Sequence, residues 1–137
     1  MTDMDDFNQQ VIAEFRANGG KVGGAFEGAT ILLLTTTGAK SGRERVNPVV
    51  CRVDGDDVYV FASKAGAPTH PDWFHNLVAH PEVRVELGSD AYRACAVRVE
   101  GPARDAVYEA HAADYPNFAE YQAGTDRIIP VVRLDRI

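Results

Sequence analysis

The spacing of apolar residues predicts a helix near the start of the chain and a strand after it. In residues 6–17, Phe7, Val11 and Phe15 recur at every fourth position, so they would share one face of an amphipathic helix. The glycine-rich stretch 18–29 ends this pattern. The run ATILLLTTT is short, apolar and rich in threonine, which is typical of a buried strand.

Alternating segments farther along the chain predict two β-hairpins. NPVVCRV and VYVFAS flank a turn at residues 54–57, and VRVEL and AYRACAVRVE flank Gly88-Ser89. Between the hairpins, Pro71 and Pro81 bracket a short helix. A further helix is predicted in ARDAVYEAHAADY. The chain closes with RIIPVVRLDRI as a strand, which Pro130 should place at a sheet edge or a bulge.

About six strands with mostly antiparallel connections, together with three helices, predict a mainly β, α+β fold built as a small closed or split β-barrel. The length of 137 residues suits one domain. In it, residues 1–28 would form an N-terminal helix and a glycine-rich linker, and residues 29–137 the barrel. No G-x-G-x-x-G follows a predicted strand, so the pattern does not indicate a Rossmann nicotinamide site.

The composition excludes several classes of protein. With 20 acidic and 14 basic residues the net charge is −6, which argues against nucleic acid as the main partner. No apolar run reaches the roughly 20 residues that span a bilayer. The acidic start MTDMDDFNQQ is unlike a signal peptide and disfavours peripheral contact with anionic lipid. We therefore expect a cytoplasmic location.

Cysteines and histidines do not form a recognisable metal pattern. Cys51 and Cys95 match no zinc spacing and are too few for a disulfide framework, so two reduced thiols on strands are expected. His70, His75 and His80 are five residues apart, which would direct successive side chains about 140° apart on a helix. No metal site is predicted.

The stretch TTTGAKSGRERVNP concentrates positive charge on an acidic protein. Lys40, Arg43 and Arg45 lie within six positions, beside Gly38 and Gly42. Glycines let backbone N–H groups turn toward an anion, and the basic side chains neutralise it. The stretch thus predicts a site for a compact anionic ligand. The alternative is a solvated hairpin loop whose charges serve only solubility.

The stretch ASKAGAPTHPDWFHNL has the residues of a site for a flat ring. Its small residues would let a ring approach the main chain, and Lys64 adds a cation. Trp73 and Asn76 are three positions apart and would share a helix face. A core pair of Trp73 with Leu77 is the more common role of such residues, and both interpretations stay open.

A third stretch, DYPNFAEYQ, places Tyr115, Phe118 and Tyr121 three positions apart. These aromatic side chains would either pack in the core or form a wall over a planar ligand. Neither G-x-S-x-G nor a Walker spacing occurs, so the patterns of a hydrolase elbow and of a P-loop are both missing.

Taken together, LLLTTTGAKSGRERVNPVV and ASKAGAPTHPDWFHNLVAHPEV resemble the two signature stretches of the deazaflavin-dependent nitroreductases, which are actinobacterial oxidoreductases that use coenzyme F420. The resemblance runs from about Ala29 to Val83 and more loosely to the C-terminus. It implies a split β-barrel of the flavin-reductase/FMN-binding type. It also implies hydride transfer from reduced F420 to a small electrophilic acceptor, such as a quinone, an activated enone or a nitro compound.

The resemblance further implies which residues bind the cofactor. Basic and small residues would hold its phosphate and acidic tail, and residues of the next strand, loop and helix would line the deazaflavin ring. The implied tail ligands are Lys40, Ser41, Gly42, Arg43, Arg45 and Lys64, and the implied ring ligands are Pro48, Val49, Ala62, Ser63, Trp73 and Asn76.

In the same resemblance, Tyr115, Phe118 and Tyr121 would cover the acceptor pocket, and Ser63 or Tyr121 would orient the acceptor. Two positions depart from the family pattern. Phe118 cannot donate a hydrogen bond as tyrosine would, and Ala39 stands where relatives often have arginine.

The sequence is also compatible with three other interpretations. The same barrel would also suit FMN, although FMN lacks the long acidic tail that several cations would hold. A non-catalytic module that stores F420 or an apolar ligand is a second rival, and a binder of single-stranded nucleic acid is a third. The chain would act as a monomer or a homodimer.

Overall fold

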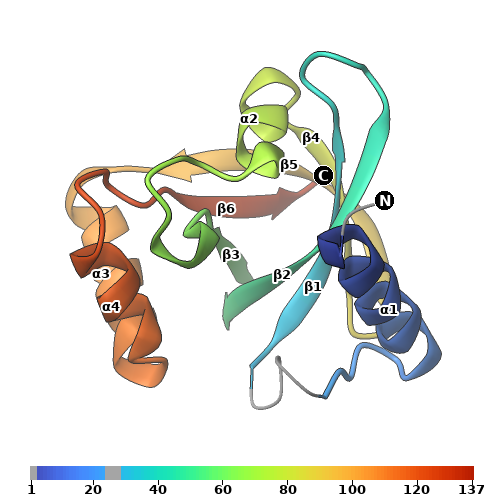
Figure 1. Cartoon of the computed structure of the whole chain (residues 1–137), viewed down its shortest axis with the longest axis horizontal. Coiled ribbons are helices and arrows are strands. Elements are labelled where there is room, and N and C mark those ends of the chain that lie inside the picture. The colour runs from blue at the N-terminus through green and yellow to red at the C-terminus, as the bar shows by residue number, and fades with distance from the viewer. Residues whose placement is uncertain (1–2, 24–28) are drawn as a thin grey trace.

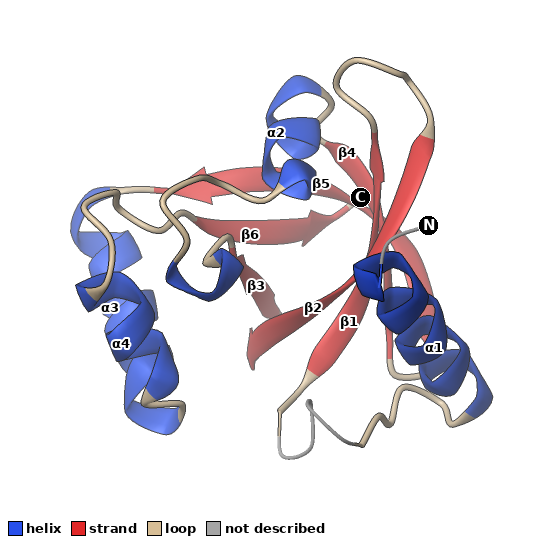
Figure 2. Ribbon diagram, in the orientation of Figure 1, coloured by secondary structure: helices blue, strands red, loops and turns tan. Residues whose placement is uncertain are grey.

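Six antiparallel strands close into a barrel in the computed structural model, which describes residues 3–23 and 29–137 and, for residues 3–6, only the backbone (Figures 1 and 2). The order around the barrel is β1-β2-β3-β6-β5-β4, and β1 closes it by pairing with both β2 and β4. The strands are β1 (Ile31–Thr37), β2 (Glu44–Asp54), β3 (Asp57–Phe61), β4 (Glu82–Leu87), β5 (Asp90–Val99) and β6 (Val131–Arg136). The predicted antiparallel barrel and both hairpins are confirmed.

The helices lie outside the barrel or across its end (Figure 2). They are α1 (Asp3–Ala17), the short 3₁₀ turn η2 (Lys64–Gly66), α2 (Asp72–Ala79), α3 (Gly101–Asp114) and α4 (Asn117–Ala123). The three predicted helices are present as α1, α2 and α3, but α4, which a break separates from α3, was not predicted. The break follows from Pro116, which disfavours helical geometry at the preceding Tyr115, where φ is −130°.

The expectation that Pro130 marks an edge or a bulge was also wrong. β6 pairs with β3 on one side and with β5 on the other. Pro130 lies just before the strand begins, where its missing N–H removes no ladder hydrogen bond. Its carbonyl still accepts a hydrogen bond of 3.0 Å from the Ala62 N–H, so the position fits a paired strand.

The barrel interior is filled by alternate residues of the strands and closed at one end by α2. From α2, Trp73, Phe74 and Leu77 pack into the same buried cluster as Leu34 and Val49. This packing fixes α2 beside the turn between β1 and β2, as Figure 1 shows. Of the two interpretations left open for Trp73, the structure bears out the core pair with Leu77, and a role in cofactor binding stays a prediction.

Two groups of helices cover different parts of the outer surface (Figure 1). The apolar face of α1 packs on β1 through Phe15 and Leu33, and Arg16 forms hydrogen bonds of 3.1 and 2.9 Å with Glu86 on β4. On the other side, α3 and α4 cover Phe61 of β3. Val50 of β2 contacts both clusters, so the outer face of β2 runs between them.

The predicted glycine-rich linker falls partly on residues 24–28, which lie outside the described residues. Before them, Gly20 passes close to the β4–β5 turn. A Cβ at this position would approach the Gly88 backbone at 2.6 Å, and φ is +96°. Only glycine fits such a crossing. Over the described chain, none of the helices has the length and apolar composition that a membrane span requires.

Candidate functional site

The turn between β1 and β2 is a compact structure stabilised by its own backbone. The Gly38 N–H donates to the Arg43 carbonyl at 2.7 Å, and the Gly42 N–H donates to the Gly38 carbonyl at 3.0 Å. The Ser41 hydroxyl oxygen accepts from the Arg43 N–H at 3.2 Å. Gly42 has φ +71°, and a Cβ on Gly38 would collide with the Ser41 hydroxyl. Glycine at position 42 is therefore favoured by its backbone conformation, and glycine at position 38 leaves room for the Ser41 hydroxyl.

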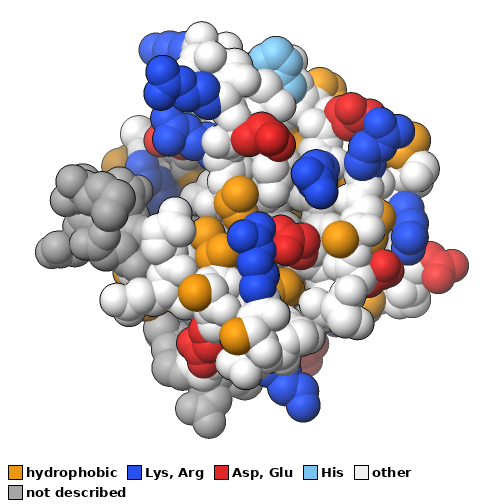
Figure 3. All heavy atoms as spheres, turned by 90° about the vertical axis from the view of Figure 1, so that its right-hand side faces the viewer, with side chains coloured by type: hydrophobic (Ala, Val, Ile, Leu, Met, Phe, Trp, Pro, Cys, Tyr) orange, Lys and Arg blue, Asp and Glu red, His pale blue; other side chains and the backbone are white. Residues whose placement is uncertain are grey.

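The basic side chains of this turn extend into solvent without partners. Lys40, Arg43 and Arg45 are exposed, and none of them has an ion-pair partner in the part of the chain that the structure describes. Of the nine arginines elsewhere, all except Arg84 and Arg127 pair with carboxylates: Arg16, Arg52, Arg93, Arg98, Arg104, Arg133 and Arg136. Figure 3 shows basic side chains gathered at the upper edge of the molecule, the end at which Figure 1 places this turn.

Asn76 holds the turn against α2. Its Oδ1 accepts from the Ala39 N–H at 2.9 Å, and its Nδ2 donates to the Thr36 hydroxyl at 3.1 Å. The side chain is only 8% exposed. Because both ends of the amide are used within the protein, Asn76 positions the basic turn from behind instead of extending into open space.

The predicted ring-lining residues are divided between the two faces of the barrel wall. Val49 and Ala62 lie in the buried interior cluster, and Trp73 lies there with them at 8% exposed. Pro48 is half-buried and alternates with Val49, which places it on the outer face opposite Leu33. The side chains of these interior residues are therefore buried in the barrel. Only their backbone can face the outer surface.

The Ser63 loop (residues 62–70) follows β3 and packs against α4. A Cβ on Gly66 would lie 3.0 Å from the Tyr121 carbonyl oxygen, so the loop touches the α4 backbone there. Lys64 and Ala65 both have positive φ, at 46° and 54°, a strained conformation for residues with a side chain. The two residues predicted to orient an acceptor, Ser63 and Tyr121, thus come from adjoining segments.

The predicted aromatic wall is split between core and surface. Phe118 is 6% exposed and packs with Phe61, so it belongs to the core. Tyr115 ends α3 and is half-buried, as is Tyr121 on α4. The Tyr121 hydroxyl accepts from Asn117 Nδ2 at 3.1 Å, which leaves its own proton free to be donated.

Sequence reasoning missed His111, which is fully buried under these aromatic residues. Its ring stacks on Phe61 at 4.1 Å and meets Phe118 edge-on at 4.5 Å. Among the described residues neither ring nitrogen has a hydrogen-bond partner. Burial, with a smaller contribution from the positive charge of Arg52, lowers the pKa of His111 to about 4. The imidazole is therefore neutral near pH 7.

A signal for His111 existed in the sequence, although not in the apolar residues. The buried side chains of α3 are Arg104, Tyr108 and His111. They are four and three positions apart, the spacing of one helix face. Since all three are polar types, a search for apolar periodicity passes over this face.

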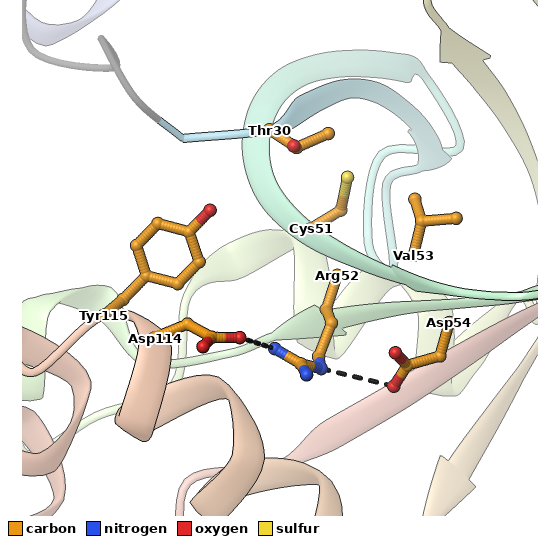
Figure 4. Close-up of a pocket in the computed structure, with 7 residues that line it drawn as sticks. All are labelled: Thr30, Cys51, Arg52, Val53, Asp54, Asp114 and Tyr115. Carbon is orange, nitrogen blue, oxygen red and sulfur yellow. Dashed lines mark hydrogen bonds and ion pairs between the residues drawn. The ribbon is translucent and has the colours of Figure 1, made fainter.

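A small pocket of about 230 Å³ lies at the far end of β2 from the basic turn (Figure 4). Figure 4 shows Arg52 between Asp114 and Asp54, with which it pairs at 2.8 and 3.2 Å. The guanidinium is thus already neutralised and offers little attraction to an anion. Tyr115 and Cys51 also line this pocket.

The two cysteines lie on strands of the barrel. Cys51 and Cys95 are free thiols on β2 and β5, as predicted. Burial raises the pKa of Cys51 to about 12, which keeps its thiol protonated and unreactive. No group of three or more potential metal ligands occurs in the described ranges.

Comparisons with known proteins show the family to which the chain belongs. The family model described as F420H(2)-dependent quinone reductase matches residues 8–135. An F420H(2)-dependent quinone reductase of Mycobacterium tuberculosis is 38% identical over 131 residues, which cover 90% of this chain and 86% of that protein. A solved F420-H2 dependent reductase, FDR-A, is 40% identical with a TM-score of 0.70, covering 77% of this chain and 93% of its own. A structure described as a domain-swapped dimer is 34% identical with a TM-score of 0.73, covering 98% of this chain and 100% of its own.

Proposed function

Because this chain belongs to the family of F420H(2)-dependent quinone reductases, we propose that it reduces a small electrophilic acceptor with electrons from F420H2. The chain is an F420-dependent oxidoreductase by this membership. The proposal concerns the acceptor, which is a quinone, an activated enone or a nitro compound, and the residues that bind cofactor and acceptor. A cytoplasmic location is part of the same proposal.

The observation that carries the proposal is the set of unpaired cations on the β1–β2 turn. Lys40, Arg43 and Arg45 repel one another where no carboxylate of the described chain neutralises them. A phosphate with a following acidic tail would relieve this repulsion. Each charge-assisted hydrogen bond to such a group contributes about 1.5–3 kcal/mol. FMN carries a single phosphate and would leave part of this charge unpaired.

The ring of the cofactor fits beside the tail site, along the outer face of β2. Pro48 offers an apolar surface there, and the Ser63 loop lies at the adjoining end of β3. Val49, Ala62 and Trp73 support this surface from the interior. Their proposed role is to shape the site, while contacts to the ring come from the main chain.

When bound, the reduced deazaflavin supplies a hydride from its C5 carbon, and the acceptor takes it up with its two electrons. Tyr121 or Ser63 donates a hydrogen bond from its hydroxyl to the acceptor oxygen and orients it. A quinone also needs a proton to become a hydroquinone, which the Tyr121 hydroxyl or a water beside it delivers. The packed aromatic residues around Phe118 limit the access of bulk water.

The test is turnover with a soluble quinone, an enone and a nitroaromatic compound, each at equal concentration. Loss of F420H2 is followed by the return of the absorbance of oxidised F420. The proposal predicts acceptor-dependent oxidation with the quinone, at a rate far above the reaction without protein. Tight binding of F420 with no turnover of any acceptor would favour a storage module instead.

A further inference from the structure

Arg127, in the connection between α4 and β6, binds the Ser63 loop with its whole guanidinium group. Nε donates to the Ala67 carbonyl at 2.8 Å, and Nη2 donates to the Ser63 carbonyl at 2.7 Å. Nη1 donates to the Ala62 carbonyl at 3.1 Å and lies 3.0 Å from His70 Nδ1. A single side chain therefore ties together both ends of the loop.

The loop needs such a restraint because its backbone is strained. Lys64 and Ala65 have positive φ, a conformation that persists only where the surroundings enforce it. The loop's own hydrogen bonds, from the Gly66 N–H to Ser63 and from the Ala67 N–H to Lys64, close only the inner turn. Arg127 fixes that turn relative to the barrel.

Because a peptide bond is planar, the hydrogen bonds that fix the loop carbonyls also fix the direction of the N–H groups in the same peptides. Since the Ala62 and Ser63 carbonyls point toward Arg127, the N–H groups of Ser63 and Lys64, in the same two peptide planes, point away from it. Within residues 3–23 and 29–137, neither N–H group donates to a protein acceptor. A guanidinium on the carbonyl side also polarises both peptides and strengthens their N–H groups as donors.

Arg127 is itself held in place from the other side. Gln122 Nε2 donates to the Arg127 carbonyl at 2.8 Å. Gln122 Oε1 accepts from Arg104 Nη2 at 2.6 Å and from the Ile129 N–H at 3.0 Å. The half-buried Gln122 therefore fixes the main chain at Arg127 before any ligand arrives.

We propose that Arg127 is a positioning residue for the ring end of the cofactor site. It holds the Ser63 loop so that the N–H groups of Ser63 and Lys64 face the carbonyl oxygens of the bound ring. The inference rests on the proposed function, in which this loop adjoins the ring. It adds a residue that lies outside both signature stretches and acts through the main chain.

The experiment compares two probes, F420 and 8-hydroxy-5-deazariboflavin, which has the ring and its ribityl chain but lacks the phosphate and acidic tail. Arg127→Gln should weaken the binding of both probes by about tenfold or more, since the ring site is lost for each. Lys40→Ala with Arg45→Ala should weaken F420 alone. Arg136→Gln, which removes an exposed arginine paired with Asp90, is the matched control and should change neither affinity.

This comparison separates the inference from the proposed function. If the wild-type chain binds neither probe, the proposed function fails. If it binds both and a folded Arg127→Gln variant binds both equally well, the role of Arg127 is refuted. Should Arg127→Gln not fold, Arg127→Lys decides, because lysine keeps the charge but cannot reach the same acceptors with a planar fork. A folded Arg127→Lys variant should bind 8-hydroxy-5-deazariboflavin several-fold more weakly, and wild-type affinity would overturn the inference.

Discussion

Replacing His111 with phenylalanine should make the fold less sensitive to acid. The imidazole is fully buried, and in the described chain both of its nitrogens are without partners. Burial lowers its pKa to about 4, whereas an unfolded chain binds the proton near pH 6.5. The unfolded state therefore holds more protons between these values, so acid shifts the equilibrium toward unfolding.

The size of this effect follows from the two pKa values. The difference between 6.5 and about 4 corresponds to about 3 kcal/mol. That stability is fully present above pH 6.5 and is lost as the pH falls to 4. At pH 5 the loss should already be about 2 kcal/mol. Phenylalanine preserves the ring that stacks on Phe61 and has no group to protonate.

The assay is urea unfolding of the wild type and His111→Phe at about pH 7.5 and about pH 5. Other acidic and basic groups contribute equally to both proteins, so the difference between the two pH-dependent losses isolates His111. The wild type should lose about 2 kcal/mol more than the variant. His80→Gln, at an exposed histidine after α2, should behave like the wild type. If the wild type and His111→Phe lose the same free energy of unfolding between the two pH values, His111 is not the source of the acid sensitivity.

Two further variants test the site itself. Asn76→Leu removes the acceptor of the Ala39 N–H, so it should lower the free energy of unfolding in urea by about 1–3 kcal/mol. It should also weaken F420 binding in a fluorescence titration, whereas His75→Ala on the exposed side of the same helix should do neither. Tyr121→Phe should lower kcat for quinone reduction about tenfold or more at unchanged F420 affinity, if its hydroxyl orients the acceptor. An unchanged kcat in steady-state turnover would assign that role to Ser63.

The strands and the basic turn could be predicted because their signals are local. Alternation of apolar residues and the glycine-containing turns set the hairpins, and the charges of Lys40 and Arg45 follow directly from the residue types. Pro116 also carried a readable signal, since it separates α3 from α4, but the stretch after it was interpreted only through its aromatic residues and α4 was missed.

The side-chain partners could not be predicted, because they depend on contacts between distant segments. Pro48 and Val49 are neighbours in sequence, yet the barrel wall places one outside and the other inside. Asn76 is a predicted cofactor ligand, but the sequence gives no sign of its hydrogen bonds to β1 and the turn. Arg127 contacts residues about 60 positions earlier, which no short motif reveals.

In the proposed function, Lys40, Arg43 and Arg45 of the β1–β2 turn bind the acidic tail of F420. The most direct test is a parallel titration of Trp73 fluorescence with F420, FMN and NADP, in the wild type and in the Lys40→Ala, Arg45→Ala double variant. F420 alone should bind tightly to the wild type, and the double substitution should weaken it about a hundredfold or more at unchanged stability. Equal affinity of the wild type for FMN, or an F420 affinity that survives the loss of both cations, would contradict the account.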